Sequence, residues 1–338
     1  MRLFLFQVFV LLLPILFLLS CNSGKQDLKK RKVIGEAQGT YYAISYYDSH
    51  DRILKQEFDS VLDAFDMSAS NYKEQSIISK VNSNKNVKLD SIFIGNFKLA
   101  MRVSSQTNGD FDITVRPLVE AWGFGKRRAE DMDSNIVDSI MQFVGFNKIY
   151  LDNNSQIIKT DPRVQIDFDA LAQGYSVDVL AKYLRSMGIN SFLIDVGGEI
   201  FASESKIDGS DWKVGVETPK DSAAYGEDLS AIIPLKNQGM ATSGNYRKFY
   251  VKNGVKYAHT IDPHSGYPIA SRLLSTTVIA NTAAEADAYA TAFMVMGLEK
   301  TKKFVVKHPE LEVFLIYSDD DGNYNYFSTP KLSKVVEN

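Results

Sequence analysis

The sequence predicts an α+β fold in which mixed antiparallel sheets carry packed helices. Apolar residues recur at helical spacing in some segments and alternate with polar residues in others. These patterns follow one another without a regular strand–helix–strand rhythm, and the chain has no Gly-x-Gly-x-x-Gly fingerprint and no P-loop. The three observations favour an α+β arrangement over a doubly wound parallel sheet.

In the first half of the chain, one-sided apolar stripes predict the helices, and alternating Tyr- and Ile-rich stretches predict the strands. We expect Asn108-Gly109 to end a helix, because both residues tolerate the left-handed conformation that often follows a last helical turn. In order, the patterns predict a strand pair at 33–47 interrupted by Gln38-Gly39-Thr40, a helix at 52–66, a polar loop at 68–76, and helices at 91–107 and 134–143.

In the second half, apolar runs bounded by Gly, Asn and Asp predict strands, and an Ala-rich segment predicts a long helix. Asn281 and Thr282 are suited to cap that helix. In order, we expect a hairpin at 148–151 and 156–160, a helix at 170–184, strands at 191–196, 212–217 and 229–235, a hairpin at 249–252 and 255–261, a strand at 273–280, helices at 283–296 and 298–307, and a hairpin at 311–317 and 324–327.

The first 32 of the 338 residues are not expected to belong to the fold. Arg2 precedes an apolar run that ends in Leu18-Leu19-Ser20-Cys21, the pattern of a secretory signal. The ending resembles a bacterial lipobox, so we expect residues 1–20 to be removed and Cys21 to be lipidated. An uncleaved membrane anchor is the alternative, but the run is short for spanning a bilayer. The protein is then expected to be held at a membrane and to face the periplasm, with residues 21–32 as a tether.

The composition of the remaining domain, residues 33–338, excludes some classes of function and some kinds of cross-link. Loss of Arg2 with the signal leaves 37 of the 38 Lys and Arg residues against 41 acidic residues, so no basic surface for nucleic acid is expected. Cys21 is the single cysteine, which excludes an internal disulfide. We find no Pro/Gly/Ser-rich break and no internal repeat, so one domain is expected.

Residues 241–268 form a run with an unusual concentration of turn residues. Asn253-Gly254 lies between two β-rich segments, which is a strong hairpin signal. Loops rich in hydroxyls and glycine are expected on either side, at 242–245 and 262–266, where backbone N–H groups can face an anion. His259 lies late in the return strand, close to the second loop. An ordinary surface hairpin explains the turn, but it does not explain the whole run.

Three carboxylate patterns suggest a site. Asp287 and Thr291 are four residues apart on one helical face, flanked by alanines, and could reach Mg²⁺, although a solvated helix surface is the simpler reading. Asp167 and Asp169 precede another Ala-rich helix, where they could cap the helix or hold a ligand. Asp110 and Asp112 flank Phe111 and would share one side of a strand. Taken together, these three patterns and the anion-friendly loops at 242–245 and 262–266 point to a Mg²⁺-assisted nucleotide or dinucleotide site.

These segments resemble the ApbE family of FAD:protein FMN transferases, in the family's order and over nearly the whole mature chain. The resemblance rests on TNGDFDITVRPLV at 107–119, IDFDALAQGYSVD at 166–178, IDVGGEI at 194–200, the run at 241–268, and ADAYATA at 286–292. It implies a T-fold-like architecture that binds FAD as substrate and Mg²⁺. It also implies transfer of FMN to a Thr or Ser hydroxyl of an acceptor protein, expected to be a membrane redox subunit, with release of AMP.

The resemblance also assigns roles to individual residues. Asp287 and Thr291 would ligate Mg²⁺ through their side chains and Ala170 through its carbonyl, and His259 would be the general base near the flavin phosphate. The FAD site would comprise Gln38, Tyr72, Asp110, Phe111, Asp112, Asp167, Gln173 and His259. Gln173 stands where many members carry Lys, and Gln38 where a Met often precedes Gly-Thr, and both differences bear on FAD affinity.

Two other functions remain open at this point. Water could replace the acceptor hydroxyl, which would make the protein an FAD pyrophosphatase that yields FMN and AMP. Alternatively, the chain could be a lipid-anchored flavin-binding protein without catalytic activity, a reading that the missing Lys at Gln173 supports.

Overall fold

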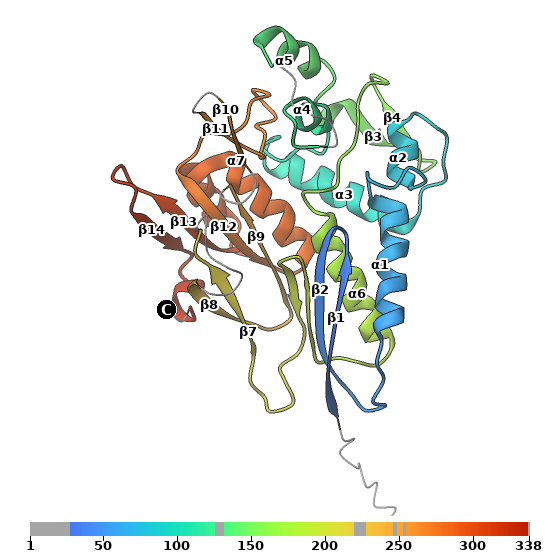
Figure 1. Ribbon diagram of the computed structural model, residues 1–338, viewed down its shortest axis with the longest axis vertical. Coiled ribbons are helices and arrows are strands. Elements are labelled where there is room, and N and C mark those ends of the chain that lie inside the picture. The colour runs from blue at the N-terminus through green and yellow to red at the C-terminus, as the bar shows by residue number, and fades with distance from the viewer. Residues whose placement is uncertain (1–27, 126–131, 220–227, 246–248, 253–254, 337–338) are drawn as a thin grey trace, which may run out of the picture.

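The computed structural model describes residues 28–125, 132–219, 228–245, 249–252 and 255–336 (Figure 1). The expected signal segment, Cys21 and the Asn253-Gly254 turn lie outside these ranges, so their assignments stay predictions. Within the described ranges, no helix combines the length and apolar character needed to cross a bilayer. Figure 1 shows the start of β1 at one end of the molecule and β10, β11 and α4 at the opposite end.

An eight-stranded sheet runs through the molecule in the order β1-β2-β5-β6-β9-β12-β13-β14, and every neighbouring pair is antiparallel. This confirms the predicted α+β class with antiparallel sheets. Its strands are β1 (Lys29–Ala37), β2 (Thr40–Asp48), β5 (Phe192–Val196), β6 (Glu199–Ala202), β9 (Gln238–Gly244), β12 (Leu273–Ala280), β13 (Glu312–Ser318) and β14 (Tyr324–Ser328).

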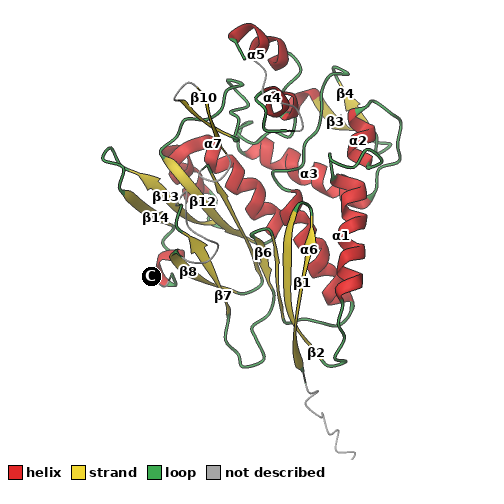
Figure 2. Cartoon of the chain, viewed as in Figure 1, coloured by secondary structure: helices red, strands yellow, loops and turns green. Residues whose placement is uncertain are grey.

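Three two-stranded sheets and a set of helices surround this sheet (Figure 2). The small sheets pair β3 (Ile149–Leu151) with β4 (Ile157–Lys159), β7 (Trp212–Glu217) with β8 (Leu229–Leu235), and β10 (Phe249–Lys252) with β11 (Val255–Ala258). The helices are α1 (Lys55–Ala69), α2 (Ile77–Asn82), α3 (Ser91–Gln106), α4 (Arg116–Ala121), α5 (Ser134–Met141), α6 (Ala172–Ser186) and α7 (Ala283–Lys307).

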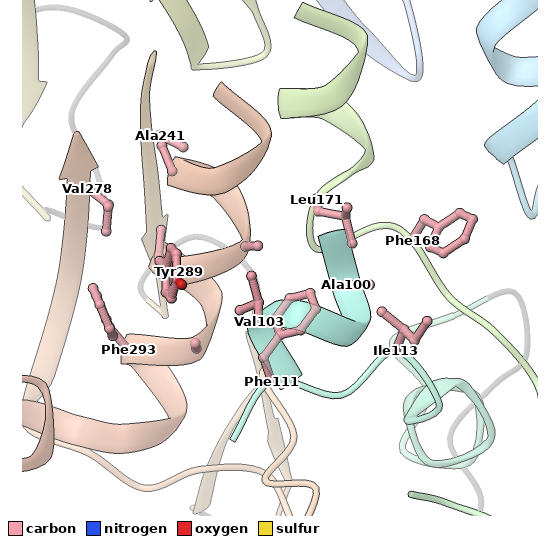
Figure 3. Close-up of a cluster of buried hydrophobic side chains, with 14 of the residues drawn as sticks. Ala100, Val103, Phe111, Ile113, Phe168, Leu171, Ala241, Val278, Tyr289 and Phe293 are labelled. Atoms are coloured by element: carbon pink, nitrogen blue, oxygen red, sulfur yellow. The ribbon is translucent and has the colours of Figure 1, made fainter. Parts of the chain in front are cut away.

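The main sheet has a core on each face because successive side chains of a strand point to opposite sides. Helix α7 packs on β9 and β12, and α6 packs on β5 and β6. On the helix side, Ala241 and Val278 join the cluster that contains Phe293 of α7 (Figure 3). On the other side, their chain neighbours Met240 and Ile279 pack with residues of β7 and β8.

Helix α7 begins and bends where the sequence indicates. The side chain of Thr282 accepts a hydrogen bond from the backbone N–H of Glu285, as expected of a cap. Gly297 has φ of 71° and ψ of 177°, a conformation that few other residues adopt, and it divides the element into two helical parts. The two predicted helices, 283–296 and 298–307, are therefore confirmed as parts of α7.

Several element boundaries require correction. Strand β1 begins at Lys29, so the last four residues of the expected tether pair with β2. Residues 242–245, expected as a loop, largely belong to β9, and β6 and α2 were not predicted. These segments are short, so tertiary contacts rather than intrinsic propensity decide their conformation.

Candidate functional site

Helix α7 starts in close contact with the backbones of α6 and β9. A side chain at Gly174 of α6 would place its Cβ 2.4 Å from the carbonyl oxygen of Ala283. At Gly239 of β9, a Cβ would lie 2.2 Å from the backbone nitrogen of Ala283. Both distances are far below van der Waals contact, so glycine is required at both positions. The three elements consequently meet at the first residue of α7.

Asp287 lies at this junction and is not a solvated helix residue. Its side chain is buried, and its Oδ2 accepts a hydrogen bond from the backbone N–H of Gly174 at 3.1 Å. Burial, with a further contribution from the negative charge of Asp178, raises the pKa of Asp287 from 3.8 to about 7. One turn later, the hydroxyl of Thr291 lies 3.3 Å from the hydroxyl of Ser243 on β9. The structure therefore places the predicted pair between α6, α7 and β9.

The donors at this junction fit Mg²⁺ better than a transition metal. Asp287 and Thr291 offer a carboxylate and a hydroxyl, and Ala170 lies in the turn just before α6. A buried carboxylate with a raised pKa gains stability when a cation keeps it ionised. Among the described residues, no group of three or more His, Cys, Asp or Glu side chains could hold a metal. A Mg²⁺ ion here would thus rely on few protein oxygens and on substrate phosphates, as is common for this ion.

Asp178 is a residue of this junction that the sequence analysis missed. It lies one turn after Gly174 on α6, and its two carboxylate oxygens accept hydrogen bonds from the backbone N–H groups of Ala283 (2.9 Å) and Ala284 (3.0 Å). Burial raises the pKa of Asp178 to about 7. Asp178 ends the 166–178 segment that resembles the family, but that segment does not reveal its role, because its partners are more than 100 residues away.

Asp167 and Tyr72 lie near each other because both form hydrogen bonds with Asp169. Asp167 accepts hydrogen bonds from the side chain of Asn71 (3.1 Å) and from the backbone N–H of Asp169 (2.9 Å). The Tyr72 hydroxyl donates to Asp169 at 3.4 Å, and the nearby carboxylate raises the pKa of Tyr72 to about 12. Loss of hydration and the charge of Asp167 raise the pKa of Asp169, although part of its side chain remains exposed.

Arg116 supplies a cation beside these carboxylates, and the sequence analysis did not identify it. Its guanidinium lies 3.6 Å from Asp167 and 3.0 Å from Glu120. It also lines a cleft of 760 Å³ between α4 and α5, which Arg163 and Gln165 border.

Asp110 has partners from two distant parts of the chain. Its Oδ1 lies 3.1 Å from Nε2 of His264 and 3.8 Å from the ammonium of Lys300. Gly109, with φ of 88°, turns the backbone so that a Cβ there would be only 3.3 Å from the His264 ring. The predicted turn at 262–266 thus reaches the 109–112 segment. His264 is visible in the sequence as a second histidine of the run, but Lys300 carries no such signal.

The expected carboxylate pair around Phe111 needs correction, because residues 110–112 do not form a strand. The Phe111 side chain is only 2% exposed and packs in the core with Val103 (Figure 3). Only the backbone of Phe111 is therefore available to contact a ligand. Asp112 is also buried, and it accepts hydrogen bonds from Thr114 and from the backbone N–H of Phe146. Burial raises the pKa of Asp112. Asp112 therefore stabilises the turn through its bonds to Thr114 and Phe146.

Gln173 lies in the first turn of α6, and Gln38 contacts the same end of this helix from the β1–β2 turn. Gln38 occupies the β1–β2 turn with φ of 55°, and its Oε1 accepts a hydrogen bond from the Ser176 hydroxyl at 3.2 Å. A Cβ at Gly197 would lie 2.8 Å from Nε2 of Gln173, so the β5–β6 turn also contacts this region. A cleft of 620 Å³ opens beside Gln38, between the β1–β2 turn and α1.

His259 directly follows β11, at the end of the described hairpin strands. The next residue, Thr260, accepts a backbone hydrogen bond from Ile269 at 3.0 Å, which closes the loop that carries His264. His259 is thus adjacent in sequence to the loop that reaches Asp110.

Comparisons with known proteins show which family the chain is similar to. The model of the ApbE family matches residues 38–315. A protein of Haemophilus influenzae named FAD:protein FMN transferase is 32% identical over 318 residues, covering 90% of this chain and 91% of the relative. A protein of Escherichia coli with the same name is 30% identical over 342 residues, covering 96% of each chain.

Solved structures extend the likeness to three dimensions. Flavin transferase ApbE from Vibrio cholerae has a TM-score of 0.80 at 28% identity, covering 91% of this chain and 99% of that chain. Flavinyl transferase ApbE from Pseudomonas stutzeri has a TM-score of 0.81 at 27% identity, covering 91% and 97%. The predicted ApbE architecture and transferase class are confirmed. This chain belongs to the ApbE family.

Proposed function

We propose that this protein transfers FMN from FAD to the hydroxyl of a Thr or Ser residue in an acceptor protein, with release of AMP, in a Mg²⁺-dependent reaction. The names of its relatives support flavin transfer. The observation that carries the metal dependence is the buried Asp287, whose raised pKa makes a bound cation favourable. The oxygen donors around it suit a hard cation.

The residues that would hold Mg²⁺ are Asp287, Thr291 and Ala170, the last through its carbonyl. A bound Mg²⁺ supplies charge neutralisation for the two phosphates of FAD. The role of Asp287 is to present its ionised carboxylate from a position that Gly174 fixes by a hydrogen bond.

The chemical step forms one bond and breaks another. The acceptor hydroxyl oxygen attacks the phosphorus of the FMN half, and the bond from that phosphorus to the bridging oxygen of the AMP half breaks. His259 takes the hydroxyl proton as general base, and AMP leaves with the bridging oxygen. Asp110, Asp167 and Tyr72, each supported by the neighbours described above, would bind and orient the FAD.

The envelope location belongs to the same proposal. The lipobox-like sequence at Cys21 supports attachment to a membrane, with the domain facing the periplasm. The acceptor we propose is a membrane-bound redox protein, which the attached enzyme could reach at the same surface.

The test is to incubate the purified protein with FAD, Mg²⁺ and a candidate acceptor, and to measure acceptor mass and AMP together. We expect an FMN adduct on a Thr or Ser residue and one AMP for each adduct. Release of AMP and free FMN at the same rate without acceptor would favour a pyrophosphatase. Retention of FAD without any AMP would favour a non-catalytic flavin-binding protein.

A further inference from the structure

We propose that Asp178 is a positioning residue for the Mg²⁺ site, holding α7 at a fixed place on α6. This inference rests on the proposed function only for the identity of the cation and of FAD. It assigns a role to a partly buried carboxylate that the proposed reaction does not itself use.

Asp178 makes two of the three hydrogen bonds that join α6 to α7 among the described residues. Its oxygens accept from the N–H groups of Ala283 and Ala284, and the third bond runs from Gly174 N–H to Asp287. Gly174 and Asp178 are four residues apart and lie on the same face of α6. The two helices are therefore tied at the start of α7 and again at the proposed metal ligand.

This geometry matters because the proposed ligands come from both sides of the contact. Ala170 precedes α6, whereas Asp287 and Thr291 are on α7. Mg²⁺ requires nearly octahedral coordination with metal–oxygen distances of about 2.0–2.1 Å. A small shift of α7 along α6 would therefore displace two of the three ligands relative to the third.

Ordinary helix capping does not account for Asp178. The cap of α7 is Thr282, whose hydroxyl accepts from the backbone of Glu285 at 3.1 Å. Asp178 reaches the same helix start from a different helix, and it contacts Ala283, the residue on which α6 and β9 converge. Thr282 stabilises α7 itself, whereas Asp178 fixes where α7 lies.

The two residues provide a matched pair for an experiment. Asp178→Asn removes one of the two acceptors, and Thr282→Ala removes the cap at the same helix end without touching α6. Each purified variant would be titrated with Mg²⁺ in two ways: by calorimetry with FAD present and acceptor absent, and by the rate of FMN transfer. Thermal unfolding would report the stability of each variant.

We expect Asp178→Asn to raise the Mg²⁺ concentration for half-saturation at least about tenfold, the usual effect of losing an outer-sphere partner, with the KM for the acceptor unchanged. Thr282→Ala should lower the unfolding temperature and keep the wild-type Mg²⁺ dependence. Asp178→Glu retains the charge but lengthens the link between the helices, so it should give a smaller increase.

Wild-type Mg²⁺ affinity in a folded Asp178→Asn protein would overturn the inference. If that variant does not fold, wild-type Mg²⁺ affinity in Asp178→Glu would overturn the inference. An equal loss of Mg²⁺ affinity in Thr282→Ala would also overturn it. The calorimetric titration needs no acceptor, so a wild-type protein that fails to transfer FMN contradicts the proposed function without deciding the role of Asp178.

Discussion

The carboxylate of Asp287 on α7 accepts a hydrogen bond from the backbone N–H of Gly174 on α6, at 3.1 Å. The contact is possible because Gly174 lacks a side chain where the two helices meet. It fixes the only acidic side chain among the proposed metal ligands, so the chemistry depends on a close helix–helix approach.

Replacing Asp287 by Asn should abolish FMN transfer while the fold remains intact. The amide has nearly the same shape as the carboxyl group but carries no charge for the cation. We expect at least a roughly 100-fold loss of transfer at saturating FAD, because the variant removes a first-sphere ligand. Circular dichroism and FAD binding would verify the fold, and full transfer at ordinary Mg²⁺ concentrations would remove Asp287 from the mechanism.

The stability of the metal-free protein should fall as the pH rises from about 4 to about 7. In this window the folded protein retains a proton on Asp287, whose pKa is raised to about 7, while the unfolded chain has already lost it. The decline should be on the order of 2–4 kcal/mol. Asp178, with a similarly raised pKa, contributes in the same direction.

Urea unfolding across this pH range measures the effect. Asp287→Asn should flatten the decline, and the remaining slope should belong to Asp178. Mg²⁺ should stabilise the wild-type protein more at pH 8 than at pH 5, because binding must displace the proton at the lower pH. A Mg²⁺ effect independent of pH would argue against Asp287 as a ligand.

Gly174→Ala should destabilise the protein and weaken Mg²⁺ binding together. The new Cβ would lie 2.4 Å from a backbone oxygen of Ala283, which cannot rotate away. We expect a loss of about 1–3 kcal/mol, typical of overpacking. Gly95→Ala is the matched control, since its Cβ would meet only the outer end of the Tyr175 side chain. Equal effects of the two substitutions would speak against a special role for the α6–α7 contact.

The two histidines of the 259–264 segment should behave differently. His259→Ala should lower kcat about 10²- to 10⁴-fold, the range for loss of a general base, with little change in KM for FAD. His264→Ala removes a partner of Asp110 and should mainly raise the KM for FAD, by about tenfold, which corresponds to one charge-assisted hydrogen bond. Steady-state kinetics on both variants distinguishes the roles, and a near-normal kcat in His259→Ala would reject the base assignment.

The sequence predicted the long periodic elements because their apolar patterns record which face is buried. It placed α3, β7, β8, β12 and both parts of α7 close to their observed bounds. It failed for β6, which has only four residues, and for β9, whose small residues become strand only because neighbouring strands supply the hydrogen bonds.

In the candidate site, too, some residues could be predicted from the sequence and others could not. The spacing of Asp287 and Thr291 and the place of Asp167 before a helix suggested a site, but only the resemblance to the ApbE family assigned these residues their roles. Asp178, Arg116 and Lys300 could not be predicted, because each acts on residues that are distant in the chain. The assignment of Asp112 to the FAD site stays a prediction, and a local motif could not reveal that its carboxylate accepts hydrogen bonds from Thr114 and Phe146.

The most direct measurement is intact-protein mass spectrometry of an acceptor incubated with FAD, Mg²⁺ and either the wild-type protein or Asp287→Asn. The account predicts an FMN adduct on a Thr or Ser residue with equimolar AMP for the wild type, and neither product for the variant. Unmodified acceptor accompanied by free FMN, or equal adduct from both proteins, would contradict it.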